Sequence, residues 1–161
     1  MKKLNVLFAL FALSLGAKAD NLPVQSMKDI EGCWERIVFS EPVKKQMNPV
    51  EPWPAPYQWF CFEADGTYSS VMSTQPIKTS ATELRQAFKA LPKSFRYTVE
   101  PNGFIKTEAL NGQETYYWAS AFLGQDVNFD NKTIRKGTLI MSIPSEDGST
   151  GIYWRYLNRV K

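Results

Sequence analysis

The sequence predicts an all-β fold, an eight-stranded antiparallel up-and-down barrel with one short helix between the third and fourth strands. Short runs rich in aromatic and β-branched residues recur along the chain, Gly, Asn and Asp turn signals separate them, and a single segment has helical spacing. Eight strands in mostly hairpin order is the number that such a barrel needs. A β-sandwich is the alternative, because strand number alone does not separate the two.

Each predicted strand is a short run bounded by turn residues. In chain order the strands are residues 32–39, 57–64, 67–73, 94–100, 104–109, 113–122, 137–143 and 151–160. Asp65-Gly66 and Asn111-Gly112 are two-residue type I′ hairpin signals. We therefore expect the first to join the second and third strands, and the other to join the fifth and sixth.

The one predicted helix covers residues 80–91. Ser80 and Glu83 have the spacing of a capping box, and Leu84 and Phe88 belong to one apolar stripe. We expect this helix to cover one opening of the barrel. A mobile portal over a ligand mouth is the alternative.

Residues 40–56, between the first two strands, contain five prolines. Proline at this density removes backbone donors and keeps the chain extended, so we expect a stiffened loop rather than a strand. Trp53 stands between two of these prolines. We expect its ring to plug the mouth of the barrel; an exposed residue that docks a partner is the alternative.

Residues 1–19 predict a cleaved signal peptide. Its parts are a positive start, an apolar stretch too short for a membrane span, and a small-x-small cleavage site at Ala17-Lys18-Ala19. Residues 20–161 then form one barrel domain. No Cys follows the cleavage site, so we expect a periplasmic or secreted protein without a lipid anchor. A permanent N-terminal anchor is the alternative.

Charge and the missing histidines narrow the function classes. The chain has 19 basic and 16 acidic residues, and three of the basic ones lie in the predicted leader. The balanced remainder gives no electrostatic case for nucleic acid. Histidine is absent, which excludes His-based triads, the usual His-bearing zinc sites and a His-ligated haem. We therefore expect no enzyme activity, no metal and no cofactor.

Two cysteines in an exported chain predict one disulfide, Cys33–Cys61. A redox-active pair is the alternative, but the C-x-x-C spacing is missing. Period-two alternation supports the disulfide, because Phe60 and Phe62 share one strand face and Trp34 faces opposite to Cys33. If these three rings point inward, both cysteines point outward on neighbouring strands.

The same alternation gives the inner face aromatic rings and a few polar groups. The candidate ligand-binding residues are Arg36, Phe60, Phe62, Tyr68, Tyr116, Trp118 and Met141. This lining suits an apolar pocket with polar anchors, and it suits a solid core equally well. Arg36 turns inward in the register that buries Trp34, and a buried cation needs an acid, water or a ligand head group. A bulge that releases Arg36 to solvent is the alternative.

Three features carry a family resemblance: the triplet Gly32-x-Trp34, the hairpin Phe62-x-x-Asp65-Gly66-x-Tyr68, and a last strand that bears arginines. Together they resemble the lipocalin and calycin barrels, in particular the small exported bacterial lipocalin-like proteins. In that family the Trp plugs the closed base of the barrel and an Arg lies across its ring. The resemblance implies the same for Trp34, and register favours Arg159 as the arginine, with Arg155 as the runner-up.

The resemblance implies a non-enzymatic binding protein for a small hydrophobic or amphipathic molecule held in the barrel lumen. The alternative is a periplasmic protein-interaction or inhibitor barrel that acts through its proline-rich loop, with Trp53 and the turn at residues 145–148 as the contact surfaces. The two hypotheses differ in the role of Trp53, because ligand binding should survive its loss better than docking does.

Overall fold

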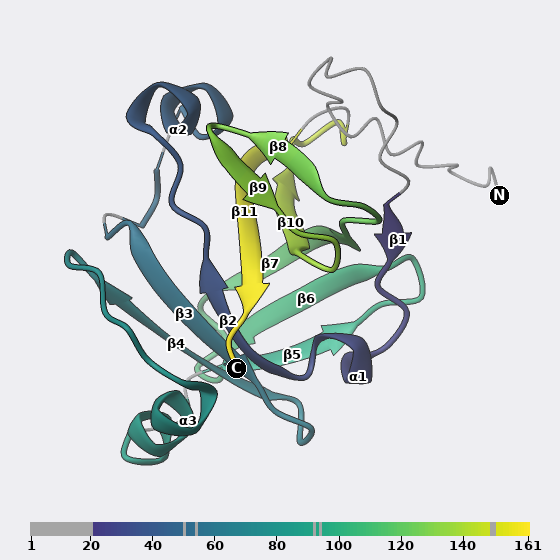
Figure 1. Cartoon of the computed structure of the whole chain (residues 1–161). Coiled ribbons are helices and arrows are strands. Elements are labelled where there is room, and N and C mark those ends of the chain that lie inside the picture. The colour runs from purple at the N-terminus through teal and green to yellow at the C-terminus, as the bar shows by residue number, and fades with distance from the viewer. Residues whose placement is uncertain (1–20, 50, 54, 92, 94, 149–150) are drawn as a thin grey trace, which may run out of the picture.

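The computed structural model describes residues 21–49, 51–53, 55–91, 93, 95–148 and 151–161 (Figure 1). The signal peptide predicted over residues 1–19 lies outside the described residues. The same holds for Ser94, the predicted first residue of the fourth strand, and for Pro54 in the proline-rich loop.

Eight antiparallel strands form a closed barrel, as predicted. They are β2 (Gly32–Arg36), β3 (Tyr57–Phe62), β4 (Thr67–Ser73), β5 (Phe95–Val99), β6 (Phe104–Ala109), β7 (Thr115–Phe122), β10 (Leu139–Pro144) and β11 (Gly151–Arg159). Each strand pairs with the next of these in the chain, and β11 pairs with β2 to close the ring. Continuous pairing around the ring excludes the β-sandwich alternative.

The structure adds elements that the sequence did not predict. A short strand β1 (Leu22–Pro23) pairs with β7, and β8 (Val127–Phe129) and β9 (Lys132–Ile134) form a separate hairpin. Three helices are present among the described residues, not the one predicted: α1 (Met27–Ile30), α2 (Glu41–Met47) and α3 (Ala81–Lys89). In Figure 1, α1 and α2 lie at opposite ends of the barrel.

Helix α2 corrects the prediction that residues 40–56 lack regular structure. Proline occupies the first turn of α2, where its missing N–H would have no helical partner in any case. The prolines therefore do not prevent a short helix at the start of the loop. The first barrel strand also ends at Arg36, three residues earlier than the predicted limit at residue 39.

Helix α3 has the predicted capping box but not the predicted position. The Ser80 side chain accepts from the backbone of Glu83, and the Glu83 carboxylate accepts from the backbone of Ser80. The helix lies on the outer wall, over β2 and β3, rather than across an opening. Its Leu84 and Phe88 pack on the outward-facing Trp59 and on the disulfide. The apolar stripe thus covers an apolar patch of the wall.

The disulfide between Cys33 and Cys61 is present, and it joins directly opposed residues of β2 and β3. Their Cα atoms are 4.1 Å apart, close to the roughly 4.5 Å spacing of a non-hydrogen-bonded antiparallel pair. Both cysteines face outward, as predicted, but α3 buries them. The bond therefore ties the first two barrel strands together beneath the helix.

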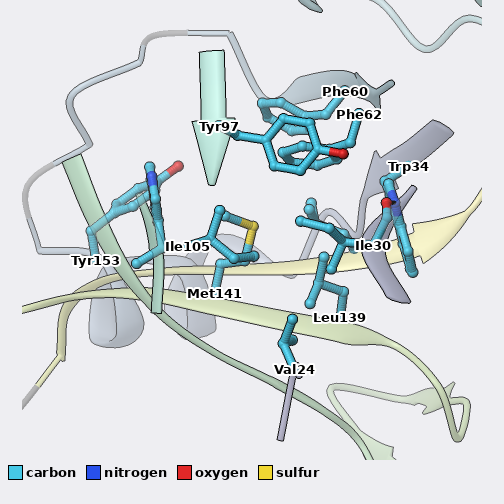
Figure 2. Close-up of a cluster of buried hydrophobic side chains, with 12 residues drawn as sticks. Val24, Ile30, Trp34, Phe60, Phe62, Tyr97, Ile105, Leu139, Met141 and Tyr153 are labelled. Atoms are coloured by element: carbon cyan, nitrogen blue, oxygen red, sulfur yellow. Dashed lines mark hydrogen bonds between the residues drawn. The ribbon is translucent and has the colours of Figure 1, made fainter. Parts of the chain in front are cut away.

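The inward faces of the eight strands form the main core. Twelve buried residues belong to it: Val24, Ile30, Trp34, Phe60, Phe62, Tyr97, Ile105, Trp118, Leu139, Met141, Tyr153 and Leu157. Figure 2 shows Trp34 and Tyr153 on opposite sides of this cluster. The lumen is therefore filled by side chains along its length, and its two ends differ in chemistry.

Candidate functional site

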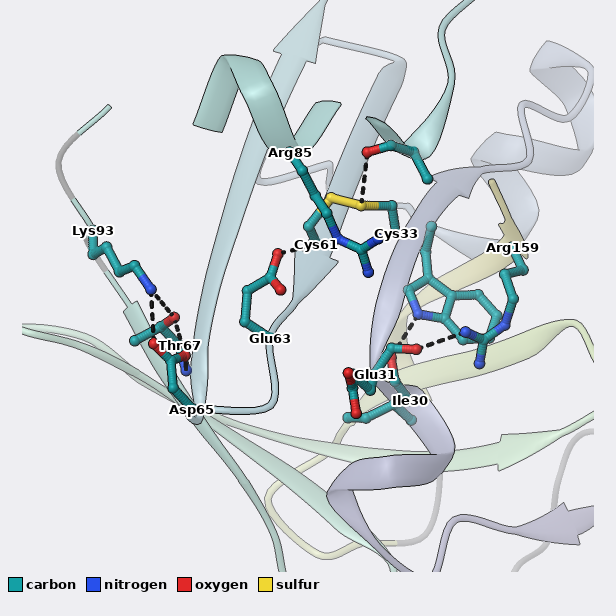
Figure 3. A network of polar contacts seen from close by, with 12 residues as sticks. Ile30, Glu31, Cys33, Cys61, Glu63, Asp65, Thr67, Arg85, Lys93 and Arg159 are labelled. Atoms are coloured by element: carbon teal, nitrogen blue, oxygen red, sulfur yellow. Dashed lines mark hydrogen bonds and ion pairs between the residues drawn. A yellow bond between two sulfur atoms is a disulfide. The ribbon is translucent and has the colours of Figure 1, made fainter. Parts of the chain in front are cut away.

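One end of the barrel, here called the base, is closed by α1, Trp34 and Arg159. The Arg159 guanidinium carbon lies 4.4 Å from the centre of the Trp34 ring, and the two residues are paired in the strand register. Trp34 Nε1 donates to the carbonyl of Ile30, and Arg159 donates to the carbonyls of Asp29 and Glu31. Figure 3 shows Arg159 beside Glu31. Both predicted residues therefore bind the last carbonyls of α1, which have no helical partner.

Gly32 is required by the packing at the base. Its φ of 124° lies in a region that other residues rarely adopt. A Cβ atom at this position would stand 2.6 Å from Nη1 of Arg159. The glycine of the triplet thus leaves room for the arginine that covers Trp34.

The opposite half of the lumen holds a second arginine, Arg155, inside a set of rings that we call the arginine cage. Its guanidinium carbon lies 4.1 Å from the ring centre of Trp53, 4.7 Å from those of Phe60 and Trp118, and 5.3 Å from that of Tyr153. Arg155 is only 7% exposed. Each close guanidinium–ring contact contributes up to about 2 kcal/mol when desolvated.

Arg155 has no acidic partner among the described residues, and its Nε has no hydrogen-bond partner there. A buried cation without an anion normally costs several kcal/mol. Burial lowers the pKa of Arg155, although a guanidinium stays protonated in proteins. The same burial raises the pKa of the Tyr153 hydroxyl, so Tyr153 is a neutral phenol and not a counter-ion. Its hydroxyl is close enough to the Arg155 guanidinium to interact with it, but it supplies no negative charge.

A second inward arginine, Arg36, lies beside the cage. It is 8% exposed, and its Nη2 lies 2.8 Å from Oε2 of Glu51, in the loop before β3. Its guanidinium carbon is 5.6 Å from the centre of the Tyr153 ring. Arg36 therefore meets an acid, which is one of the outcomes that its inward position predicted.

Several buried polar atoms around the cage lack partners. Of the seven such side-chain atoms found in the described part of the chain, four belong to this region: Arg36 Nη1, Glu51 Oε1, Tyr153 OH and Arg155 Nε. Buried polar groups in native proteins are nearly always paired with protein, water or a ligand. Their concentration marks this half of the lumen as a place for a further polar group.

The mouth loop fills the space over Arg155. The Trp53 ring lies 5.9 Å from that of Trp118 at an interplanar angle of 29°, and it also contacts Tyr116 and Tyr153. Trp53 is therefore the inward plug that was predicted, and the exposed docking alternative does not describe this structure. We call residues 51–53, which carry both Glu51 and Trp53, the plug segment.

The predicted ligand-binding residues divide between the two halves. Arg36, Phe60 and Trp118 surround the cage directly, and Tyr116 reaches it through Trp53. Met141 is the cross-strand neighbour of Arg155. Burial raises the pKa of Tyr68 to about 12, against an opposing effect of the charge on Arg155.

Phe62 does not join the cage. It is paired with Gly32 in the register and packs on Tyr68 and Tyr97, so it belongs to the half of the lumen nearer the base.

Arg155 was considered only as the runner-up to cover Trp34, and its place in the cage corrects that role. Tyr153 and Glu51 were missed. Tyr153 and Arg155 share the inward face of β11 with Leu157, so period-two alternation carried enough signal to find them. Glu51 comes from a loop, where no periodicity fixes the direction of a side chain.

A separate hollow lies on the outer wall beside α2, lined chiefly by Phe39, Met47, Trp154 and Tyr156. Arg36 also lines this hollow, but Arg155 does not. The hollow is thus distinct from the cage. In the described part of the chain no group of His, Cys, Asp and Glu side chains is arranged to hold a metal ion. No helix there is long and apolar enough to cross a membrane.

Comparisons with known protein families, curated proteins and solved structures gave no match to this chain. The closed eight-stranded antiparallel barrel is consistent with a lipocalin-like fold.

Proposed function

We propose that this protein is an exported, lipocalin-like, non-enzymatic binding protein for a small amphipathic molecule, held in the half of the lumen that contains the arginine cage. The observation that carries the proposal is Arg155, a buried guanidinium with aromatic rings around it and no acidic partner among the described residues. Aromatic walls with a few polar anchors are the usual lining of a small-molecule site.

The free-energy cost of burying a charge supports a functional role for Arg155. An apolar side chain of similar size at a buried position is often neutral or favourable for stability compared with a charged one. The ring contacts offset part of the desolvation cost, but the unpartnered Nε remains. A cation retained under these conditions is well suited to bind the polar end of a ligand.

A ligand needs room, and the plug segment is the part of the lumen best able to provide it. Trp53 belongs to a loop and is only partly buried, whereas Phe60, Trp118 and Tyr153 belong to paired barrel strands. Withdrawal of the plug segment would break no strand pairing. Loops of this kind open at a much lower free-energy cost than barrel strands.

A weak seam in the wall offers a second route into the lumen. Strands β4 and β5 pair at only two positions among the described residues, Thr67 with Arg96 and Tyr68 with Phe95. The remaining residues of β4, up to Ser73, are paired with β3 alone. Separation of β4 from β5 is therefore the least costly opening of the barrel wall.

Export and the absence of enzymatic chemistry are further parts of the proposal. The buried disulfide supports an oxidising, extracytoplasmic compartment. The cage offers arginines and rings but a single carboxylate, which does not make the paired acid and base of a hydrolytic site. Intact-mass measurement of the protein from the medium or periplasm tests export, because cleavage before residue 20 gives a defined loss of mass.

Native mass spectrometry of freshly purified protein, without detergent, tests the binding function. We expect the wild-type protein to retain a small molecule, and the Trp53→Ala variant to retain more of it because the plug is smaller. Arg155→Met should carry less. Absence of any bound molecule in both the wild-type and Trp53→Ala proteins, together with failure to take up added amphiphiles, would contradict the proposal.

A protein-interaction role is an outcome of the same experiments. If Trp53 docked a partner, Trp53→Ala would abolish capture of that partner in a pulldown. The inward packing of Trp53 gives no support to that role, so we do not adopt it.

A further inference from the structure

We propose that the ligand is a small planar aromatic carboxylate, and that the plug segment occupies its place in the free protein. This inference rests on the proposed binding function and adds the chemical class of the ligand. It follows from the two groups that the plug segment places in the lumen: an indole ring on Arg155 and a carboxylate on Arg36.

The first group defines a site for a flat ring. The indole of Trp53 is centred 4.1 Å from the guanidinium carbon of Arg155, and it lies within 29° of parallel to Trp118. Tyr153 stands at its side, with a ring-centre distance of 5.0 Å. A planar ring between a guanidinium and an indole retains both cation–π and stacking contacts. The place held by Trp53 therefore suits an aromatic ligand of about the same size.

The second group defines a site for a carboxylate. Glu51 binds Arg36 through one oxygen and one nitrogen, at 2.8 Å, while Oε1 of Glu51 and Nη1 of Arg36 have no partner among the described residues. Arginine–carboxylate pairs are strongest when two parallel hydrogen bonds form. A ligand carboxylate is not tied to the backbone, so it can adopt the bidentate geometry that Glu51 does not reach.

A ligand with one negative charge can replace the charge that Glu51 brings to the lumen. Arg36 and Arg155 contribute two positive charges to this region and Glu51 contributes one negative charge. The net charge of the region is therefore +1 when the plug segment is in place. A monocarboxylate that displaces the segment pairs with one arginine directly and lies near the other, while Glu51 moves to solvent. The exchange keeps the number of charges in the lumen unchanged.

Displacement makes the plug segment a competitor of the ligand. The apparent affinity of a site that is open for only a fraction of the time is reduced by that fraction. Weakening the hold of either plug group should therefore tighten ligand binding. If the plug segment instead contacted the bound ligand, its substitution would weaken ligand binding. The direction of the change in affinity therefore distinguishes the two roles.

Isothermal titration calorimetry with 2-naphthoate and with the neutral isostere 2-naphthalenemethanol tests the inference. The proteins are the wild type, Trp53→Ala, Glu51→Gln, Arg36→Met, Arg155→Met and a matched control, Arg96→Met. Arg96 is exposed on β5, so the control makes the same substitution outside the lumen. Glu51→Gln keeps the size of the plug segment, so it can replace Trp53→Ala as the plug variant if Trp53→Ala does not fold.

We expect 2-naphthoate to bind the wild-type and Arg96→Met proteins alike, and on the order of 10- to 100-fold more tightly than the alcohol, as a charge-assisted hydrogen bond provides. Arg36→Met should lose that preference, because it removes the partner of the carboxylate. Arg155→Met should weaken the binding of both probes, because it removes the cation that lies on the ring. Trp53→Ala and Glu51→Gln should each bind 2-naphthoate more tightly than the wild type does.

Three results would overturn the inference: equal affinity for the acid and the alcohol, an unchanged preference in Arg36→Met, or weaker naphthoate binding in both plug variants. Binding of the alcohol alone, or a copurifying molecule with no naphthoate binding, would refute the ligand class and leave the proposed binding function standing. Failure of every protein to bind either probe or any copurifying molecule would remove both.

Discussion

Two arginines, Arg155 and Arg159, lie on the same face of β11 but have different surroundings. Arg159, at the base, lies on one indole and donates to the carbonyl of Asp29 in α1 and to that of Glu31, which follows α1, so its charge and its donors are both used. Arg155, inside the lumen, is surrounded by rings, and its Nε has no partner among the described residues. The contact with an aromatic ring is common to both. Burial and hydrogen bonding separate them, because Arg159 is exposed and Arg155 is buried.

The difference shows how a guanidinium that contacts aromatic rings is assigned to structure or to function. A guanidinium whose donors bind carbonyls at a helix end is explained by the fold. A guanidinium that is desolvated, with no acidic partner and with its Nε unpaired, is not explained by stability, because unpaired buried groups cost free energy. We therefore assign Arg159 to the architecture of the barrel and Arg155 to its proposed function.

The largest expected effect on the free energy of unfolding comes from a substitution at the base. Trp34→Ala should lower the free energy of unfolding by about 3–5 kcal/mol, because it empties a fully buried aromatic site. Trp53→Ala should cost distinctly less, because that ring is only partly buried and its loss also exposes no strand. Urea unfolding of both variants measures this. Equal losses would remove the distinction between a structural base and a displaceable plug.

Removal of the disulfide should have the next largest effect on the free energy of unfolding. Replacing Cys33 and Cys61 together by Ala opens a loop with a sequence separation of 28 and should cost about 3–4 kcal/mol in the chain-entropy model. Because the bond lies on the outer wall under α3, naphthoate binding at a temperature where the variant is folded should not change. A lost binding signal in folded protein would show that the wall and the cage are coupled.

Gly32→Ala should have a smaller effect, about 1–3 kcal/mol, because the residue has a positive φ and its new Cβ would displace Arg159. Gly112→Ala is the matched control, since that glycine also has a positive φ but has open space around it. The difference between the two variants in urea reports the contact with Arg159 together with the greater backbone strain at a φ of 124° than at 70°. If both cost the same, backbone strain alone accounts for the glycine of the triplet.

Glu35 provides the smallest and most specific test, since it is a partly buried charge without an ion pair among the described residues. Burial raises its pKa in the folded protein above the ordinary value of 4.5. The folded state then binds the proton more tightly than the unfolded chain, so its contribution is most favourable below the unfolded pKa and is lost as pH rises through the folded pKa.

Glu35→Gln should therefore stabilise the protein at pH 7, by less than about 0.5 kcal/mol, and the gain should vanish at pH 4. Glu146→Gln, at an exposed position, is the control. Unfolding in urea at the two pH values checks the sign. A variant that is less stable than the wild type at pH 7 would show that the charge of Glu35 is stabilising.

The sequence was most informative where local pattern decides the structure. Turn residues and alternation predicted the eight strands and their inward faces. The cysteine count predicted the disulfide, and the family resemblance predicted the contact of Trp34 with Arg159. They failed where a tertiary contact decides: α3 covers the outer wall because Trp59 and the disulfide present an apolar surface there, which no local pattern shows. Helix α2 was missed because a short helix with a proline in its first turn is hard to distinguish from a proline-rich loop.

The candidate site was predictable only in part. Alternation placed Arg36, Phe60 and Trp118 on the inner face, and the plug role of Trp53 followed from the loop that carries it. The missing information was three-dimensional. Whether Arg155 meets an acid, and whether Glu51 reaches Arg36, depends on side chains that come together from strands and a loop distant in the sequence.

The most direct test of the account compares Arg155→Met with Arg159→Met in equilibrium urea unfolding. We predict that Arg155→Met leaves the free energy of unfolding unchanged or raises it, because an apolar side chain replaces a buried charge that lacks a partner. Arg159→Met should lower it by about 1–3 kcal/mol, because the carbonyls of Asp29 and Glu31 lose their donor. If Arg155→Met were the more destabilising of the two, Arg155 would be a structural residue, and the assignment of the cage to ligand binding would be wrong.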